Sequence, residues 1–159
     1  MPEPIEYDVL LDLQTALRAI SIAGGYHHDV ESAAVSVDPH DEIEILTGQL
    51  AHNPYFTISV SPGRTLQYQP AMQVLEVIPV DITAAADATA LVATSRLQTF
   101  QRLCADVEQA LAVDITRGAR AVDTRVLEKS MGMMVGGTRV IAAIQAEVRL
   151  YRTYGEPNG

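Results

Sequence analysis

The stretch Val140–Thr153, "VIAAIQAEVRLYRT", decides the fold of this chain. Apolar residues occupy every second position of its centre and alternate with Gln145, Glu147 and Arg149, which is the period of a half-buried strand. The alternating apolar residues are Ile144, Ala146, Val148 and Leu150. A helix is the alternative, with an apolar face made of Ile141, Ile144, Val148 and Tyr151. We favour the strand, so that the chain ends in a sheet.

The segments just before this stretch complete a hairpin and supply a helix. Residues 124–135 are predicted to pair with 140–153 around Gly136-Gly137. Residues 90–112 carry the strongest helical period, with apolar residues spaced by three and four, and this stripe should pack on the sheet. The stripe consists of Ala93, Leu97, Phe100, Cys104, Val107 and Leu111.

The first half of the chain predicts one further helix and several strands. Residues 5–22 place Ile5, Val9, Leu13, Leu17 and Ile20 on one helical face, and Gly24-Gly25 follow as a helix end prefers. Strands are expected at 32–37, 55–60, 65–69 and 72–78, and the last should end or bulge at Pro79 because proline cannot donate to a ladder. The predicted fold is a single α+β domain over residues 1–159, with two helices packed on a mostly antiparallel sheet.

Composition narrows the possible functions. The 159 residues carry 11 basic and 20 acidic side chains, a formal charge of −9 that would repel nucleic acid. No apolar run approaches a membrane span, and the acidic N-terminus lacks the shape of a signal peptide. Cys104 is the single cysteine, so no internal disulfide exists. We expect a protein made in the host cytoplasm, with no membrane partner and no specific nucleic-acid binding.

The segment Gly24–Val30, "GGYHHDV", offers the first candidate chemistry. Neighbouring side chains of an extended segment point to opposite faces, so His27 and His28 cannot easily hold one ion. A metal-dependent hydrolase using His27, His28, Asp29 and His40 remains an alternative, since "HHD" and His40-Asp41 resemble motifs of His-Asp phosphohydrolases. Those enzymes are all-helical bundles, whereas this chain has many strands. We favour a connecting turn in which Tyr26 packs and the polar residues meet water.

Three other segments also favour structural interpretations. Cys104 lies on the apolar helical stripe and should behave as a small buried hydrophobe. Gly132–Arg139 nearly matches a phosphate-binding loop, but Thr138 replaces the required lysine, which favours a hairpin turn. Arg117 and Arg120 follow a predicted helix end, where arginine offsets the negative end of the helix dipole. His52 lies in loop-like sequence beside Pro54. No catalytic, cofactor-binding or metal-binding residue is predicted.

The order of elements and three local signatures carry a resemblance to a known family. The signatures are a first helix running into "GGYHHDV", the strands "YFTISV" and "MQVLEVIPV", and the final "AEVRLYRTYGEP". Together they resemble the tail terminator family of long-tailed bacteriophages, also called tail completion or minor tail proteins. Glu156 stands where the family commonly has aspartate.

The resemblance implies a structural virion protein rather than an enzyme. Members of that family form a hexameric ring on the head-proximal end of the tail tube, stop tube polymerisation and present a docking surface to the head connector. The implied partners are further copies of this chain, the major tail tube protein and the head–tail connector or adaptor proteins. The implied location is the tail–neck junction of a virion, and no cofactor is implied. The Ser61–Pro70 hairpin and the 132–139 turn are the expected contact loops, and a head–tail adaptor is the alternative neck protein.

Overall fold

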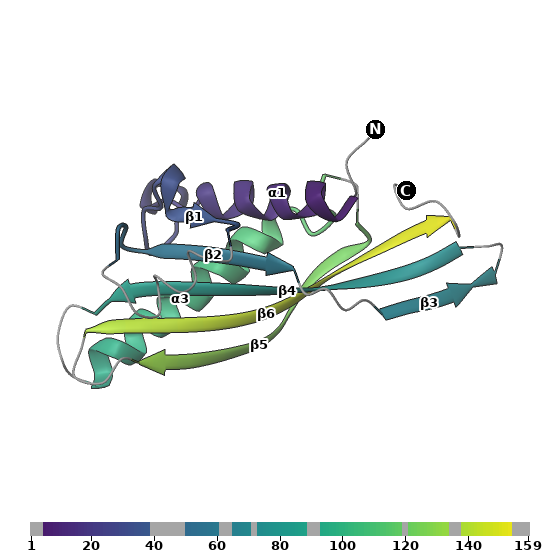
Figure 1. The fold of residues 1–159 in the computed structure, drawn as a ribbon. Coiled ribbons are helices and arrows are strands. Elements are labelled where there is room, and N and C mark those ends of the chain that lie inside the picture. Colours follow the sequence, from purple (N-terminus) through teal and green to yellow (C-terminus); the bar gives the residue numbers. More distant parts are fainter. Residues whose placement is uncertain are drawn as a thin grey trace.

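The computed structural model describes residues 5–38, 50–60, 65–70, 73–88, 93–118, 121–133 and 138–153. These residues form an α+β fold in which two α-helices pack on a six-stranded, mostly antiparallel sheet (Figure 1). The predicted fold class is therefore confirmed.

The sheet is built around two long central strands. Its order is β1-β2-β4-β6-β5, and β3 also pairs with β4. β4 (Gln73–Asp87) and β6 (Arg139–Thr153) each have 15 residues and pair antiparallel along their whole length. β5 (Asp123–Met133) pairs antiparallel with β6 and is an edge strand, with a register shift between Val126 and Glu128. β1 (Val35–Ser36) pairs parallel with β2 (Tyr55–Val60), and the remaining pairings are antiparallel.

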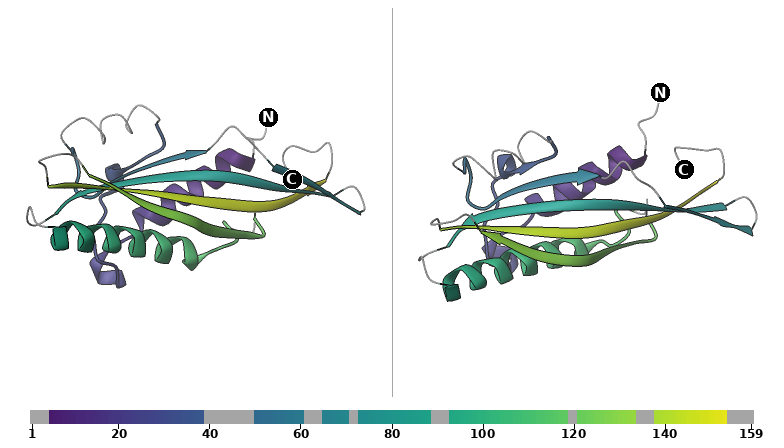
Figure 2. Two further views of the ribbon diagram at one scale, coloured as in Figure 1. Left: turned by 90° about the horizontal axis from the view of Figure 1, so that it is seen from below. Right: turned by 60° about the horizontal axis from the view of Figure 1, so that its bottom comes forward.

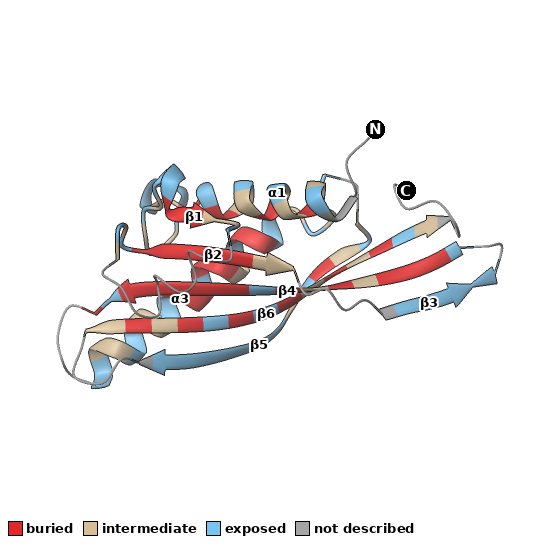
Figure 3. Ribbon diagram, viewed as in Figure 1, coloured by how far each residue is buried: buried red, intermediate tan, exposed pale blue. Residues whose placement is uncertain are grey.

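Both helices cover the same face of the sheet (Figure 2). α1 (Ile5–Arg18) contributes Val9, Leu13 and Leu17 to the core, whereas α3 (Ala93–Val113) contributes Leu103, Val107 and Leu111 among others. The even-numbered residues of β4 and β6 complete this core (Figure 3). The expected apolar face of the first helix is confirmed from Val9 to Ile20.

The contested C-terminal stretch is a strand. Ile144, Ala146, Val148 and Leu150 are all buried, and Gln145 between them is exposed. The predicted partner segment forms β5, so the closing hairpin is confirmed. Residues 134–137, which hold its glycine turn, and the tail 154–159 lie outside the described residues.

The prediction that a strand ends or bulges at Pro79 is wrong. β4 continues through Pro79, which pairs with Glu147 of β6. On the opposite edge, the registers pair Val60 with Val80 and Thr65 with Val77, so Pro79 lies at the changeover between β2 and β3. Such a position tolerates the missing N–H of proline because no continuous partner strand lies there.

The expected Ser61–Pro70 hairpin is also corrected. β3 (Thr65–Gln69) exists as predicted, but it pairs with β4 instead of folding back on β2. β2 and β3 therefore follow one another along the same edge of β4. Residues 61–64, which contain the predicted turn, lie outside the described residues.

Three boundaries also differ from the sequence prediction. The first helix ends at Arg18 rather than 22, and a 3₁₀ turn (Ile22–Gly24) follows. The expected strand 32–37 is a 3₁₀ turn (Ser32–Ala34) plus the two residues of β1, because the N–H of Ala34 bonds back to the carbonyl of Glu31. In α3 the predicted stripe is buried only from its middle onward, since Ala93 and Leu97 are exposed.

The sheet extends past the helices as a three-stranded arm (Figure 1). The arm, as defined here, consists of β3, β4 residues 73–77 and β6 residues 149–153. Glu76 and Arg152 form an ion pair within it, with Nε of Arg152 2.8 Å from Oε2 of Glu76. The arm is thus made of the same two strands that run through the core.

Candidate functional site

The "GGYHHDV" segment is held in place by Asp106, a fully buried carboxylate of α3. The backbone N–H of His27 donates to Oδ1 of Asp106 at 2.8 Å, and Nδ1 of His28 lies 2.7 Å from Oδ2. Asp29 accepts a hydrogen bond from the N–H of Ile22 at 2.7 Å. The two contacts of Asp106 hold the turn after α1 against α3, and the Asp29 contact stabilises the turn itself. This arrangement has a structural role.

Asp106 was not among the candidate residues to which the sequence pointed. The available signal was its place on the helix: Asp106 lies three residues after Leu103 and four before Ala110, both buried. An acidic residue inside an apolar helical stripe needs a partner, because an isolated buried charge is strongly unfavourable. His28 and the His27 amide provide it.

The other histidines do not join this cluster. Nδ1 of His52 lies 2.9 Å from a carboxylate oxygen of Glu31, and its ring stacks on Tyr55 at a centroid distance of 5.8 Å. His40 and Asp41 lie outside the described residues. Within the described ranges, no three His, Cys, Asp or Glu side chains are grouped so as to hold a metal ion.

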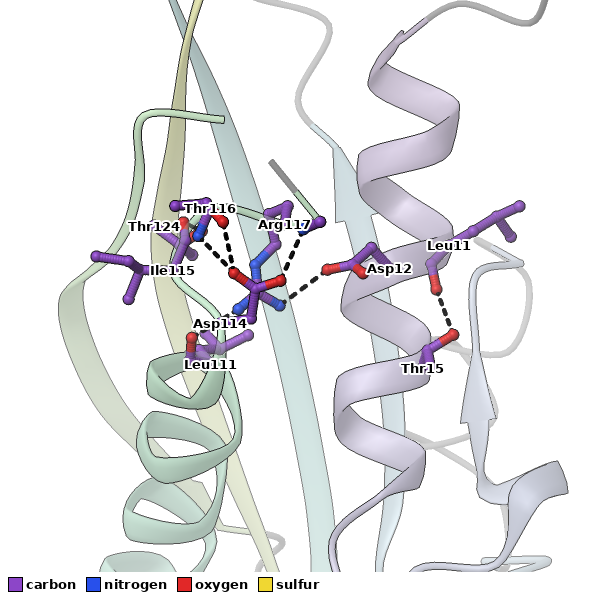
Figure 4. Close-up of polar contacts among 10 residues, drawn as sticks. Leu11, Asp12, Thr15, Leu111, Asp114, Ile115, Thr116, Arg117 and Thr124 are labelled. Carbon is purple, nitrogen blue, oxygen red and sulfur yellow. Dashed lines mark hydrogen bonds and ion pairs between the residues drawn. The ribbon is translucent and has the colours of Figure 1, made fainter. Parts of the chain in front are cut away.

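A second polar cluster joins the end of α3 to α1 (Figure 4). Arg117 is only 1% exposed. Its Nη2 donates to the carbonyl oxygen of Leu111 at 2.7 Å, and its Nη1 lies 3.2 Å from Oδ2 of Asp12 on α1. The prediction that arginine after the helix offsets its C-terminal carbonyls is therefore confirmed for Arg117. Arg120 lies outside the described residues.

Asp114 organises the loop that presents Arg117. Its carboxylate accepts hydrogen bonds from the hydroxyl and N–H of Thr116 and from the N–H of Gly118, at 2.7, 3.0 and 2.7 Å. The Thr116 hydroxyl is the main cause that lowers the pKa of Asp114 below its ordinary value, followed by the Gly118 amide. The loop turns through left-handed backbone at Arg117 (φ 49°) and Gly118 (φ 67°), which returns the arginine side chain toward the helix end.

A shallow groove of about 190 Å³ lies beside this cluster, between α1 and the C-terminal end of α3. Its walls are mainly apolar side chains, including Ala16, Ala19 and Val113, and Tyr26 closes one side. The nearby carboxylates of Asp12 and Asp114 are engaged with Arg117 and with the 116–118 loop. Both carboxylates also line the groove.

The remaining candidates also have structural surroundings. Cys104 is buried, and burial raises the pKa of its thiol to about 11, which leaves it protonated and unreactive at neutral pH. Gly132 belongs to β5 and Arg139 begins β6, so a strand follows where a phosphate-binding loop needs a helix. Both predictions of a structural role fit these positions.

Comparison with solved structures gives a likeness that extends over most of the chain. No family model and no curated protein matches the chain. A chain in the solved structure described as "Virion of native gene transfer agent (GTA) particle" is 18% identical, with a TM-score of 0.53. The match covers 88% of this chain and 92% of that chain. The two chains share a fold.

None of the described helices is long and apolar enough to cross a membrane.

Proposed function

We propose that this chain is a structural protein of a phage-like virion and, more specifically, a tail terminator. The observation that carries the proposal is the common fold with a chain of a gene transfer agent virion, which extends over most of both chains. The element order and the "GGYHHDV" and "AEVRLYRTYGEP" segments, which resemble tail terminators, support the narrower assignment.

The polar clusters of the molecule fit a non-enzymatic role. Asp106 fastens a turn to a helix, and Arg117 ties the end of α3 to α1. The named donors and acceptors of these clusters bond to one another or to the backbone, which fits a structural role. These contacts best support a structural function, in which a single α+β domain acts through its shape.

In the proposed role, six copies form a ring on the head-proximal end of the tail tube. The ring ends tube polymerisation and offers the head connector a docking surface at the tail–neck junction. The partners are other copies of this chain, the major tail tube protein and the connector or adaptor proteins. The protein would be made in the host cytoplasm and would need no cofactor.

Electron microscopy of particles that lack this protein tests the proposal. Overlong or headless tails are expected, because tube growth would lack its stop and heads would lack their docking surface. Normal tails with leaking heads would instead indicate a head–tail adaptor. Stoichiometric zinc or manganese in the purified chain, lost together with an activity in His28→Ala, would contradict both and support the hydrolase alternative.

A further inference from the structure

We propose that the exposed edge of β3 in one copy pairs with the exposed edge of β5 in a second copy, so that one sheet continues across the contact. The inference deepens the proposed function, because it rests on the chain assembling with itself. It assigns the surface by which neighbouring copies meet.

The β3 edge is an uncharged strip of polar and apolar residues at the end of the arm. Its sequence, "TLQYQ", contains no ionisable residue except Tyr68, and residues 66–70 are all exposed. Leu66 is 39% exposed and Tyr68 is 67% exposed. Because β4 occupies one side of β3, the other side is an open edge of the sheet among the described residues.

The β5 edge is a longer strip that mixes apolar and charged side chains. β5 pairs with β6 on one side and ends the strand order on the other, so its outer edge is open among the described residues. Residues 127–132 are all exposed, including Leu127 and Met131. An open edge can accept a strand of another chain, and on β5 the side chains of Arg125 and Lys129 and the register shift between Val126 and Glu128 limit where one can add.

Charge favours contact between these two strips. Each copy carries −9, so most approaches of one copy to another bring acidic surfaces together. β3 has no formal charge, and in β5 Asp123 and Glu128 are balanced by Arg125 and Lys129, which sums to zero. The two edges are thus places where equally acidic copies can meet without local repulsion.

Within one copy, the registers place Leu66, Tyr68 and Met131 on one face of the sheet. Leu66 and Tyr68 pair with Glu76 and Val74, on the face of β4 that turns toward the helices. Met131 pairs with Ala142, which belongs to the core on that same face. In a sheet continued from β5 of one copy to β3 of the next, with the helices of both copies on the same side, Leu66 and Tyr68 lie on the same side as Met131.

The two edges lie at different places on one molecule, so the contact is head-to-tail. Each copy offers β3 to one neighbour and β5 to the other, which generates a ring if the rotation closes. A second copy is the occupant that fits, because the chain itself supplies both halves of the contact. Docking of β3 on a tube or connector protein is the competing outcome.

Photo-crosslinking of the purified full chain tests the contact directly. A benzophenone amino acid at position 68 should give intermolecular products that map to residues 123–133, in amounts that rise with protein concentration and with salt. The same group at Ile22, 59% exposed on a 3₁₀ turn, is the control and should not label that segment. Intermolecular products that map elsewhere, or a chain that remains monomeric throughout, would overturn the inference.

A charge introduced at either edge gives an independent measurement. Tyr68→Asp and Leu127→Asp should each raise the Kd for self-association about tenfold or more, because each places an uncompensated charge in the contact. Ile22→Asp adds the same charge elsewhere and should change the Kd much less. Sedimentation measures the association, and circular dichroism confirms that each variant is folded. Equal effects of all three would contradict the assigned surface.

These outcomes separate this inference from the proposed function. If copies associate through another surface but particles lacking the protein still have overlong tails, only the β3–β5 contact is wrong. If tails are normal in length while position 68 crosslinks to residues 123–133, the contact stands and the terminator role fails.

Discussion

At the scale of single residues, the buried charges hold the elements in their places. Asp106 has no exposed surface, yet both of its oxygens have partners from the turn after α1. Arg117 is almost as deeply buried and links a carbonyl of α3 to a carboxylate of α1. Because removing one partner leaves the other desolvated and unpaired, such contacts should dominate the response to mutation.

Asp106→Ala should lower the free energy of unfolding by about 2–4 kcal/mol, since the His27 amide and the His28 ring lose their acceptor. Asp106→Asn keeps an acceptor oxygen and should be less harmful. Glu108→Ala, on the same helix, is the control: its ion pair with Lys129 is solvent-exposed, and such pairs contribute below about 1 kcal/mol. Urea unfolding measures all three, and an Asp106→Ala effect no larger than that of Glu108→Ala would contradict the anchoring role.

Arg117→Met should lower the free energy of unfolding by about 2–3 kcal/mol, because the Leu111 carbonyl and Asp12 lose their donor. Arg125→Met is the matched control, since Arg125 is 54% exposed and its partner Asp123 keeps the ion pair with Arg149. Its effect should stay below about 1 kcal/mol. Thermal unfolding followed by circular dichroism compares the two, and equal losses would show that burial of Arg117 adds nothing.

The pKa of Asp123 predicts a dependence on pH. Hydrogen bonds from Arg149, followed by those from Arg125, lower this pKa in the folded state. A lowered folded-state pKa stabilises the fold above the unfolded-state pKa of about 4, and this contribution is lost as the pH falls through the folded-state value. The difference in urea midpoint between wild type and Asp123→Asn should therefore shrink on acidification from neutral pH. A constant difference would exclude this linkage.

At the scale of elements, the hydrophobic period and the turn residues predicted the strongly patterned segments. They failed where contacts with distant parts of the chain determine the structure. Strand 55–60, the β5–β6 hairpin and the burial of the α1 stripe followed from residue spacing. The passage of β4 through Pro79 did not, because it depends on β2 and β3 sharing one edge of the same strand. The role of Asp106 was hidden for a similar reason, since its partners lie 78 and 79 residues away in the sequence.

The strand assignment of β6 has a direct mutational test. Ile144 is buried in the core and Gln145 points to the opposite, exposed face. Ile144→Ala should cost about 2–5 kcal/mol, whereas Gln145→Ala should stay within about 0.5 kcal/mol. Extending the pair of substitutions to Ala146→Ser and Glu147→Ala should repeat the alternation. A period of three or four residues in the measured losses would indicate a helix.

At the scale of the whole molecule, the charge of −9 governs how copies approach one another. Screening shortens the range of this repulsion, with a Debye length of about 8 Å at physiological ionic strength. Self-association should therefore strengthen with salt and with contact to the tube end. Sedimentation of the purified chain across a salt series measures this, and a tight hexamer at low salt without tube would contradict it.

The arm has a mechanical consequence. β4 and β6 run unbroken from the helix-covered core to the tip, in one register of 15 pairs. At roughly 3.3 Å per residue, each strand spans about 50 Å without a joint. A force on the tip therefore acts on the same backbone hydrogen-bond ladder on which the helices pack. We expect the arm to be stiff, with a length set by the fold.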